Sequence, residues 1–299
     1  MTRSVVRPAA PPAPPSKRSV VPWLIIVGLF AVTATYIYVA VPRTDAPRAA
    51  PSATPTAHSD GLSERHDGYT LEPLALPIGR GTAIPVAFRI RGPNGSPATR
   101  YAITQSVPLH AYVAREDLSL YQHVHPRLDG DTWRTKVDVP DGGVYRLYVE
   151  FTPEERAGTL HPTLLGVRFI ITGDTRYVPV PAAQATVRVG RLSVNRPDGT
   201  TTVAAGRPSA LRFQVVDAGG APVRTLEPYL GSFGHVSAFD VLTQAMVHLH
   251  PIAPAGAGPP ADGTLTFHAA FPYQGAQRVF VQFQVAGTVH QAAFTVLVA

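Results

Sequence analysis

From Tyr69 to the C-terminus, short runs rich in Val, Ile, Phe and Tyr alternate with clusters of turn-forming residues. The clusters include GPNG, PDGG and DAGG, and runs that are bounded by such clusters predict β-strands. No stretch of this region has a convincing helical period, although a parallel sheet would need crossover helices between its strands. The pattern therefore predicts an all-β fold of antiparallel, immunoglobulin-like β-sandwiches.

The strand pattern occurs twice along the chain. The segment VAFRIRGPNGSP resembles LRFQVVDAGGAP, and VYRLYVEF matches AQRVFVQF further on in the same order. Self-similarity of this kind is the signature of a repeat architecture. We expect two tandem β-sandwich repeats, at 69–173 and 185–299, joined by a linker at 174–184.

The N-terminal part has a different composition. Residues 1–19 and 42–68 are rich in proline and small or polar residues, a composition that buries too little apolar surface to offset the entropy of ordering. We expect both to be disordered, as a cytoplasmic tail and a linker. Residues 20–41 between them carry no charge and are long enough to cross a hydrocarbon core of about 30 Å.

The flanking charges predict the orientation of this transmembrane helix. Four cations precede it, and the positive-inside rule places them in the cytoplasm. We therefore expect a single-pass plasma-membrane protein that contacts the lipid bilayer through residues 20–41 and holds both repeats outside. A cleaved signal peptide is the alternative, but the apolar run exceeds the usual 7 to 15 residues and no convincing A-x-A site follows.

Composition excludes several kinds of chemistry. The chain has no cysteine, which rules out disulfides, a thiolate nucleophile, zinc ribbons and the His/Cys copper site of blue electron-transfer proteins. Its net charge of +6 arises largely from the four N-terminal cations, so nucleic-acid binding is not expected. No nucleophile elbow or P-loop is present, and we expect a protein that is not an enzyme.

The histidines repeat with identical spacing. Each repeat contains the pattern H-x12-H-x-H-P, followed by one more histidine in a matched GTLH or GTVH segment. The candidate ligands are His110, His123, His125 and His161 in the first repeat and His235, His248, His250 and His290 in the second.

The spacing brings three of these imidazoles together in each repeat. His123 and His125 are two residues apart, so both point to one face of a strand. A hairpin centred near Asp117 and Leu118 would place His110 opposite His125. In the second repeat, a turn near Leu242 would likewise place His235 opposite His250.

Three or four imidazoles on one face suit zinc or copper(II). Met246 lies two residues before His248 and would share its face, so its thioether favours copper(I) in the second repeat; its counterpart in the first repeat is Tyr121. The alternative is structural, because an H-x-H segment on a strand often serves packing and duplication would copy structural histidines as well.

Several segments resemble a group of exported two-repeat proteins of actinobacteria. They are LHAYVAREDLSLYQHVHP in the first repeat, and LEPYLGSFGHVSAF, MVHLHP and VFVQFQVAGTVHQAAFTV in the second. The group has no established activity, and the resemblance implies export and a link to copper or another heavy metal.

We therefore expect a membrane-anchored, extracytoplasmic protein that sequesters or delivers copper or zinc, with a metal transporter or an envelope protein as its partner. A second hypothesis is a structural or interaction module of the cell envelope that binds no metal. A third is an accessory domain of a membrane oxidase or transporter.

Overall fold

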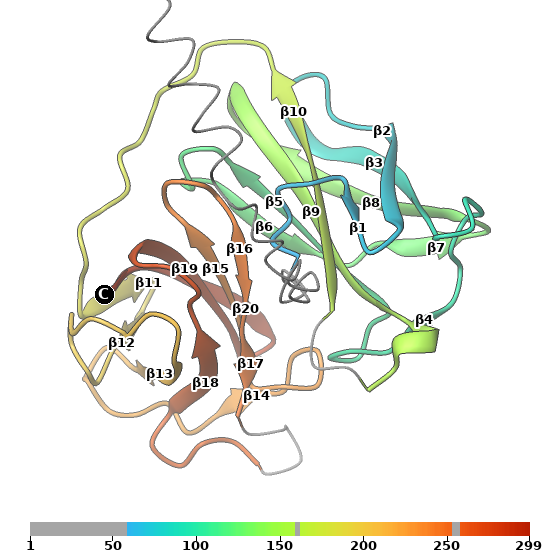
Figure 1. Ribbon diagram of the computed structural model, residues 1–299. Helices are drawn as coiled ribbons and strands as arrows, with labels where there is room; N and C mark the ends of the chain where they lie inside the picture. The colour runs from blue at the N-terminus through green and yellow to red at the C-terminus, as the bar shows by residue number, and fades with distance from the viewer. Residues whose placement is uncertain (1–58, 159–161, 253–257) are drawn as a thin grey trace, which may run out of the picture. The chain divides into compact units, whose positions relative to one another are not determined.

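The computed structural model describes residues 59–158, 162–252 and 258–299 (Figure 1). The expected tail, the expected transmembrane helix at 20–41 and most of the expected linker lie outside these residues. Within the described ranges, no helix is long and apolar enough to cross a membrane. Their helical content is a single 3-10 turn, η1 (Glu154–Arg156).

The first repeat consists of two antiparallel sheets, coloured blue to yellow-green in Figure 1. In spatial order, one sheet contains β1 (Arg65–His66), β2 (Tyr69–Ala75), β3 (Gly81–Arg91), β8 (Thr132–Val139) and β7 (Arg127–Asp129). The other contains β10 (Thr163–Ile171), β9 (Gly143–Pro153), β5 (Leu109–Arg115) and β6 (Tyr121–Val124), with β4 (Tyr101–Ala102) on β9. Phe88, Trp133 and Leu147 belong to the core of this repeat.

The second repeat has the same strand order. One sheet contains β11 (Thr186–Val189), β12 (Leu192–Asn195), β13 (Pro208–Val216), β18 (Thr264–Ala270) and β17 (His250–Pro251). The other contains β20 (Thr288–Val298), β19 (Gly275–Val285), β15 (Gly234–Asp240) and β16 (Met246–His248), with β14 (Leu226–Glu227) on β19. The all-β, tandem antiparallel fold is thus confirmed.

The first repeat begins before residue 69, within the stretch that the sequence predicted to be linker. Three backbone hydrogen bonds hold this segment: the amides of Leu71, Gly166 and Met246 donate to carbonyls of Glu64, Ser63 and Asp60, at 2.8, 2.9 and 2.8 Å. Met246 belongs to the second repeat, so the segment contacts both repeats. A composition poor in apolar residues did not prevent order here because the neighbouring strands supply the hydrogen-bond donors.

One face of the β10-β9-β5-β6 sheet meets the second repeat within a single compact unit, Ala57–Ala299. Every residue of β5 is buried, which requires both faces of this strand to be covered. Tyr121 stacks on Phe280 with ring centroids 4.2 Å apart, and its hydroxyl donates to Ser237 Oγ at 2.8 Å. This interface cluster comprises Tyr112, Ala114, Leu118, Tyr121, Tyr148, Leu164, Phe239, Met246 and Phe280.

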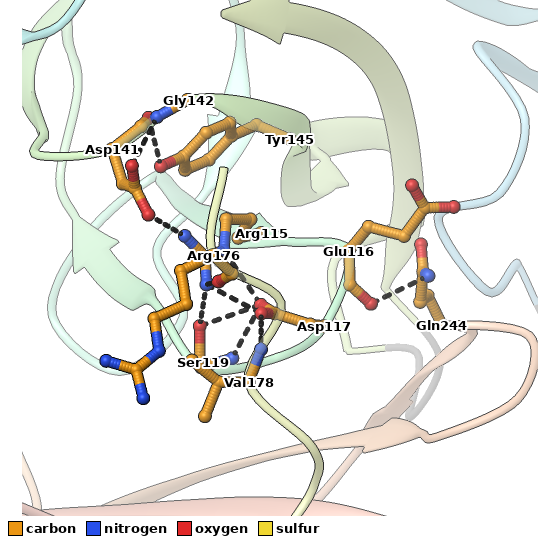
Figure 2. A network of polar contacts seen from close by, with 10 residues as sticks. All are labelled: Arg115, Glu116, Asp117, Ser119, Asp141, Gly142, Tyr145, Arg176, Val178 and Gln244. Carbon is orange, nitrogen blue, oxygen red and sulfur yellow. Dashed lines mark hydrogen bonds and ion pairs between the residues drawn. The ribbon is translucent and has the colours of Figure 1, made fainter. Parts of the chain in front are cut away.

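A polar network secures the turn between β5 and β6 (Figure 2). Arg115 donates to both carboxylate oxygens of Asp117, at 2.9 and 2.6 Å, and to Asp141 at 2.6 Å. The same guanidinium donates to the carbonyl of Arg176, and the amide of Val178 donates to Asp117, both at 3.0 Å. The network therefore ties the linker between the repeats to the hairpin that carries the histidines.

Candidate metal centre

The β5–β6 hairpin has the register that the histidine spacing predicted. Tyr112 lies opposite His123, and Ala111 lies opposite Val124. The same register, carried one residue further outward, places His110 opposite His125. Because side chains alternate along a strand, the histidines share the face that is turned towards the second repeat.

Ligand atoms of three histidines converge on this face. Nδ1 of His110 lies 3.0 Å from Nε2 of His123, and Nε2 of His125 lies 3.2 Å from the same atom. All three nitrogens lie within 4.8 Å of one another. Nitrogens bound tetrahedrally to zinc at 2.0–2.1 Å are about 3.3 Å apart, so the separations of His123 from His110 and from His125 are close to those of ligands of one ion.

The outward nitrogens of two of these rings meet acceptors. Nε2 of His110 lies 3.1 Å from the carbonyl of Thr104, so it carries the proton and leaves a lone pair on Nδ1. Nδ1 of His123 lies 3.0 Å from Oε1 of Gln282, whose amide nitrogen donates to Gln291 at 3.0 Å. Hence Nε2 of His123 also presents a lone pair. With these tautomers the lone pairs of His110 Nδ1 and His123 Nε2 face each other at 3.0 Å, and a cation between them would remove their repulsion.

Burial keeps the imidazoles of His123 and His125 in their neutral, metal-binding form. Burial, followed by the charges of His110 and His125, holds the pKa of His123 well below its usual value. Burial, followed by the charges of His110 and His235, lowers the pKa of His125 to about 4. These rings are therefore available as ligands at neutral pH, without competition from a proton.

A buried carboxylate lies beside the cluster. Glu150 is 2% exposed and pairs with His110 across β5 and β9. It accepts a hydrogen bond from the hydroxyl of Tyr112 at 2.8 Å, and the ring of Tyr112 stacks on His123 with centroids 4.6 Å apart. A carboxylate at this position would favour a cation in the site.

His235 occupies the position in the second repeat that His110 has in the first. Its Nε2 lies 2.7 Å from the carbonyl of Tyr229, just as Nε2 of His110 lies 3.1 Å from the carbonyl of Thr104. Its Nδ1 lies 3.0 Å from Oε1 of Gln105, whereas Nδ1 of His110 faces another histidine. The rings of His235 and His123 are 6.0 Å apart, so His235 borders the cluster while both of its nitrogens have other partners.

Among the side chains that the structure describes, the second repeat does not reproduce the cluster. His250 belongs to β17, which pairs with β18 in the other sheet, and there it lies opposite His268. The backbone of His248 pairs with Ser237, but its side chain is outside the described part of the structure. Among the described side chains, the one group of three histidine, aspartate or glutamate residues with this spacing is His110, His123 and His125.

The remaining predicted ligands lie elsewhere. His161 is outside the described residues. His290 stacks on Phe283, with centroids 5.5 Å apart, and its neighbour Gln291 is the residue that faces the site. His290 therefore lies on the opposite face of the sheet, away from the cluster.

Met246 has a packing role in the structure. It is 4% exposed and belongs to the apolar interface cluster, together with aromatic residues of both repeats. Tyr121, its counterpart in the first repeat, belongs to the same cluster. The thioether therefore no longer supports a preference for copper(I).

Sequence reasoning missed the residues that orient the histidines. Gln282 lies at the position of AQRVFVQF that matches Glu150 in VYRLYVEF, and the two side chains are 8% and 2% exposed. A buried polar residue between two apolar neighbours, at a matched place in the two strands, was the available signal. Gln105 and Thr104 carried no such signal, because they lie in a turn.

Comparison with known proteins places the chain in a family. No curated protein matches it. Among solved structures, the filamin domain of Lin-41 is 14% identical over 40% of this chain and 96% of that one, with a TM-score of 0.26. Invasin, a bacterial integrin-binding protein, is 14% identical over 77% and 38%, with a TM-score of 0.25.

The adhesin InvE of Yersinia pseudotuberculosis is 14% identical over 77% of this chain and 58% of that one, with a TM-score of 0.22. These scores are too low to carry an argument about this chain. The sequence profile of one family, in contrast, matches residues 64–165 and 189–299, which cover most of both repeats. The chain belongs to the family described as Domain of unknown function (DUF8832).

Proposed function

We propose that this protein binds one zinc or copper(II) ion through His110, His123 and His125, and that it sequesters or delivers this ion outside the membrane. The observation that carries the proposal is the convergence of three ring nitrogens: Nε2 of His123 lies 3.0 Å from Nδ1 of His110 and 3.2 Å from Nε2 of His125. The other ring nitrogens of His110 and His123 lie against hydrogen-bond acceptors. Fixed tautomers of this kind are characteristic of metal-ligating histidines.

The donor set supports a borderline divalent ion. All three ligands are neutral nitrogens, and imidazole suits zinc and copper(II), whereas copper(I) is selected by sulfur. The chain has no cysteine, and Met246 packs in the apolar interface. Three protein ligands leave a fourth coordination position for water or for a group on a partner, which supports exchange of the ion.

The location is part of the proposal. The uncharged run at 20–41, preceded by four cations, would anchor the protein in the plasma membrane and hold two immunoglobulin-like repeats on the outer side. A metal transporter or an envelope protein would then be the partner that gives or takes the ion. A reporter fused after residue 50 should be active only outside the cytoplasm, and activity inside would refute this location.

A metal titration tests the binding itself. The full chain is stripped with a chelator and titrated with zinc(II) or copper(II) near neutral pH, by calorimetry or by competition with a chromophoric chelator. We expect one equivalent to bind tightly, and the double change His123→Ala and His125→Ala to abolish that binding. His290→Ala is the matched control, because it removes a histidine on the opposite face of a sheet.

The competing hypothesis predicts a different outcome. If the protein is a structural module of the envelope, neither ion binds the folded wild type in a saturable manner. The histidine variants would then lower the free energy of unfolding without any ion to lose.

A further inference from the structure

The second repeat contributes to the candidate site although it supplies none of the three ligands. Gln282 lies on β19 of the second repeat and is 8% exposed. Its Oε1 accepts the proton of His123 Nδ1 at 3.0 Å, and its amide nitrogen is held by Gln291 at 3.0 Å. The amide group of Gln282 is therefore oriented by a residue of its own repeat.

This contact determines what His123 can do. A neutral imidazole carries one proton, and an acceptor at Nδ1 keeps that proton away from Nε2. His123 is also the central ligand, since its Nε2 lies 3.0 Å from His110 and 3.2 Å from His125. Without Gln282, the proton could move to Nε2 and bond to a neighbouring imidazole, which would close the site to an ion.

The interface contains the reciprocal contact. Gln105 of the first repeat lies 3.0 Å from Nδ1 of His235 in the second, and Gln282 of the second repeat lies 3.0 Å from Nδ1 of His123 in the first. The two contacts have different consequences. Nε2 of His123 faces the ring nitrogens of His110 and His125, whereas Nε2 of His235 lies against the carbonyl of Tyr229 at 2.7 Å.

We infer that Gln282 is a positioning residue for the metal centre, and that the second repeat thereby controls binding in the first. The inference rests on the proposed function. One ion binds per chain, and its affinity depends on the docking of the two repeats. By linkage, a bound ion must strengthen the contact between the repeats to the same extent.

Substitutions at Gln282 in the full chain test this inference, with zinc(II) as the probe in a chelator competition. Gln282→Leu removes the acceptor and should weaken zinc binding by about 10- to 100-fold. Gln282→Glu keeps an oxygen at this position and should retain the wild-type affinity or exceed it. Glu150 shows that a glutamate occurs at the matched position of the other repeat.

Gln277→Leu is the matched control. Gln277 lies on the same strand, is 2% exposed and donates to Asp240 at 3.0 Å, but it is not part of the histidine cluster. Its loss should lower stability without changing zinc affinity. If Gln282→Leu does not fold, Gln282→Met, which has nearly the same length, replaces it.

Failure of the proposed function and failure of the role of Gln282 give different results. If the wild type binds no zinc, the proposed function fails and this inference falls with it. If the wild type binds zinc and Gln282→Leu binds it equally well, or Gln282→Glu fails to restore binding, only the role of Gln282 is refuted.

Discussion

His110 and His235 occupy equivalent positions in the two repeats, and their Nε2 atoms lie against equivalent carbonyls, at 3.1 Å from Thr104 and 2.7 Å from Tyr229. Their Nδ1 atoms have different surroundings. That of His110 faces His123, and that of His235 faces Gln105. A duplicated histidine has thus kept its orientation in both repeats, while its second nitrogen serves a cluster in one and a cross-repeat hydrogen bond in the other.

Because the surroundings differ, substitution by alanine should lower zinc affinity at His110 and only stability at His235. Zinc sites of four ligands bind with about 10–16 kcal/mol, so losing one ligand costs about 3 kcal/mol, or roughly 100-fold in affinity. His110→Ala should show that loss in a zinc titration. His235→Ala should still bind one ion with nearly wild-type affinity, while its two lost hydrogen bonds lower stability by about 1–3 kcal/mol. Loss of binding in His235→Ala would mean that the second repeat supplies a ligand.

Tyr121 tests the apolar part of the interface between the repeats. Tyr121→Phe loses the hydrogen bond to Ser237 but keeps the stacking on Phe280, and should cost about 1 kcal/mol. Tyr121→Ala should cost about 3–5 kcal/mol in denaturant unfolding. Tyr273, which is 74% exposed, is the control, and Tyr273→Ala should change stability little. Equal effects of the two alanine variants would contradict a buried contact between the repeats.

The close approach of Gly166 to the segment before β2 gives a further prediction. A Cβ atom at Gly166 would lie 2.0 Å from the carbonyl oxygen of Gly61, and a backbone atom has little freedom to move away. Gly166→Ala should therefore cost about 1–3 kcal/mol of stability. At Gly79 an added Cβ meets no atom within 4 Å, so Gly79→Ala should cost nothing. If both variants were equally stable, the segment at 59–63 would not be docked in solution.

Acid should weaken the network around the β5–β6 turn. Burial raises the pKa of the Asp117 carboxyl, but hydrogen bonds from Arg115, Ser119 and the Val178 amide outweigh burial and hold that pKa well below 3.8. A depressed folded-state pKa contributes stability above the unfolded value, and this contribution is lost as the pH falls through the folded value. Asp117→Asn should therefore cost about 3 kcal/mol at pH 7, and the difference from wild type should shrink below about pH 4.

Glu116→Gln is the control for Asp117, measured by denaturant unfolding over the same pH range. Glu116 pairs with Arg168 at 3.2 Å, but the two side chains are 48% and 53% exposed. Such a pair is worth less than about 1 kcal/mol. If Glu116→Gln lowered the free energy of unfolding as much as Asp117→Asn does, the network would not have the role proposed for it. The same would follow if the difference in stability between Asp117→Asn and the wild type stayed unchanged in acid.

Much of the fold and of the first repeat's site follows from the sequence. Apolar runs between clusters of turn-forming residues predict the strands, and the turn at Asp117 and Leu118 sets the register that places His110 opposite His125. These features are local, because each depends on residues within one hairpin.

The rest depends on packing between distant segments. In the first repeat the chain crosses to the opposite sheet at Arg127, the start of β7, after both His123 and His125. In the second repeat it crosses already at His250, the start of β17. Gln282 meets His123 only because two sheets dock face to face. Neither the point of crossing nor the docking is encoded in a local pattern, so the second copy of the cluster was expected and the role of Gln282 was not.

The central claim is that three histidines of the first repeat hold one ion, and X-ray absorption at the zinc edge of the loaded full chain tests it most directly. The account predicts three imidazole nitrogens at about 2.0–2.1 Å, with one further oxygen or nitrogen ligand and no sulfur. In the double variant His123→Ala and His125→Ala, the imidazole scattering should disappear with the bound zinc. A spectrum without imidazole scattering, or with a sulfur ligand from Met246, would contradict the account.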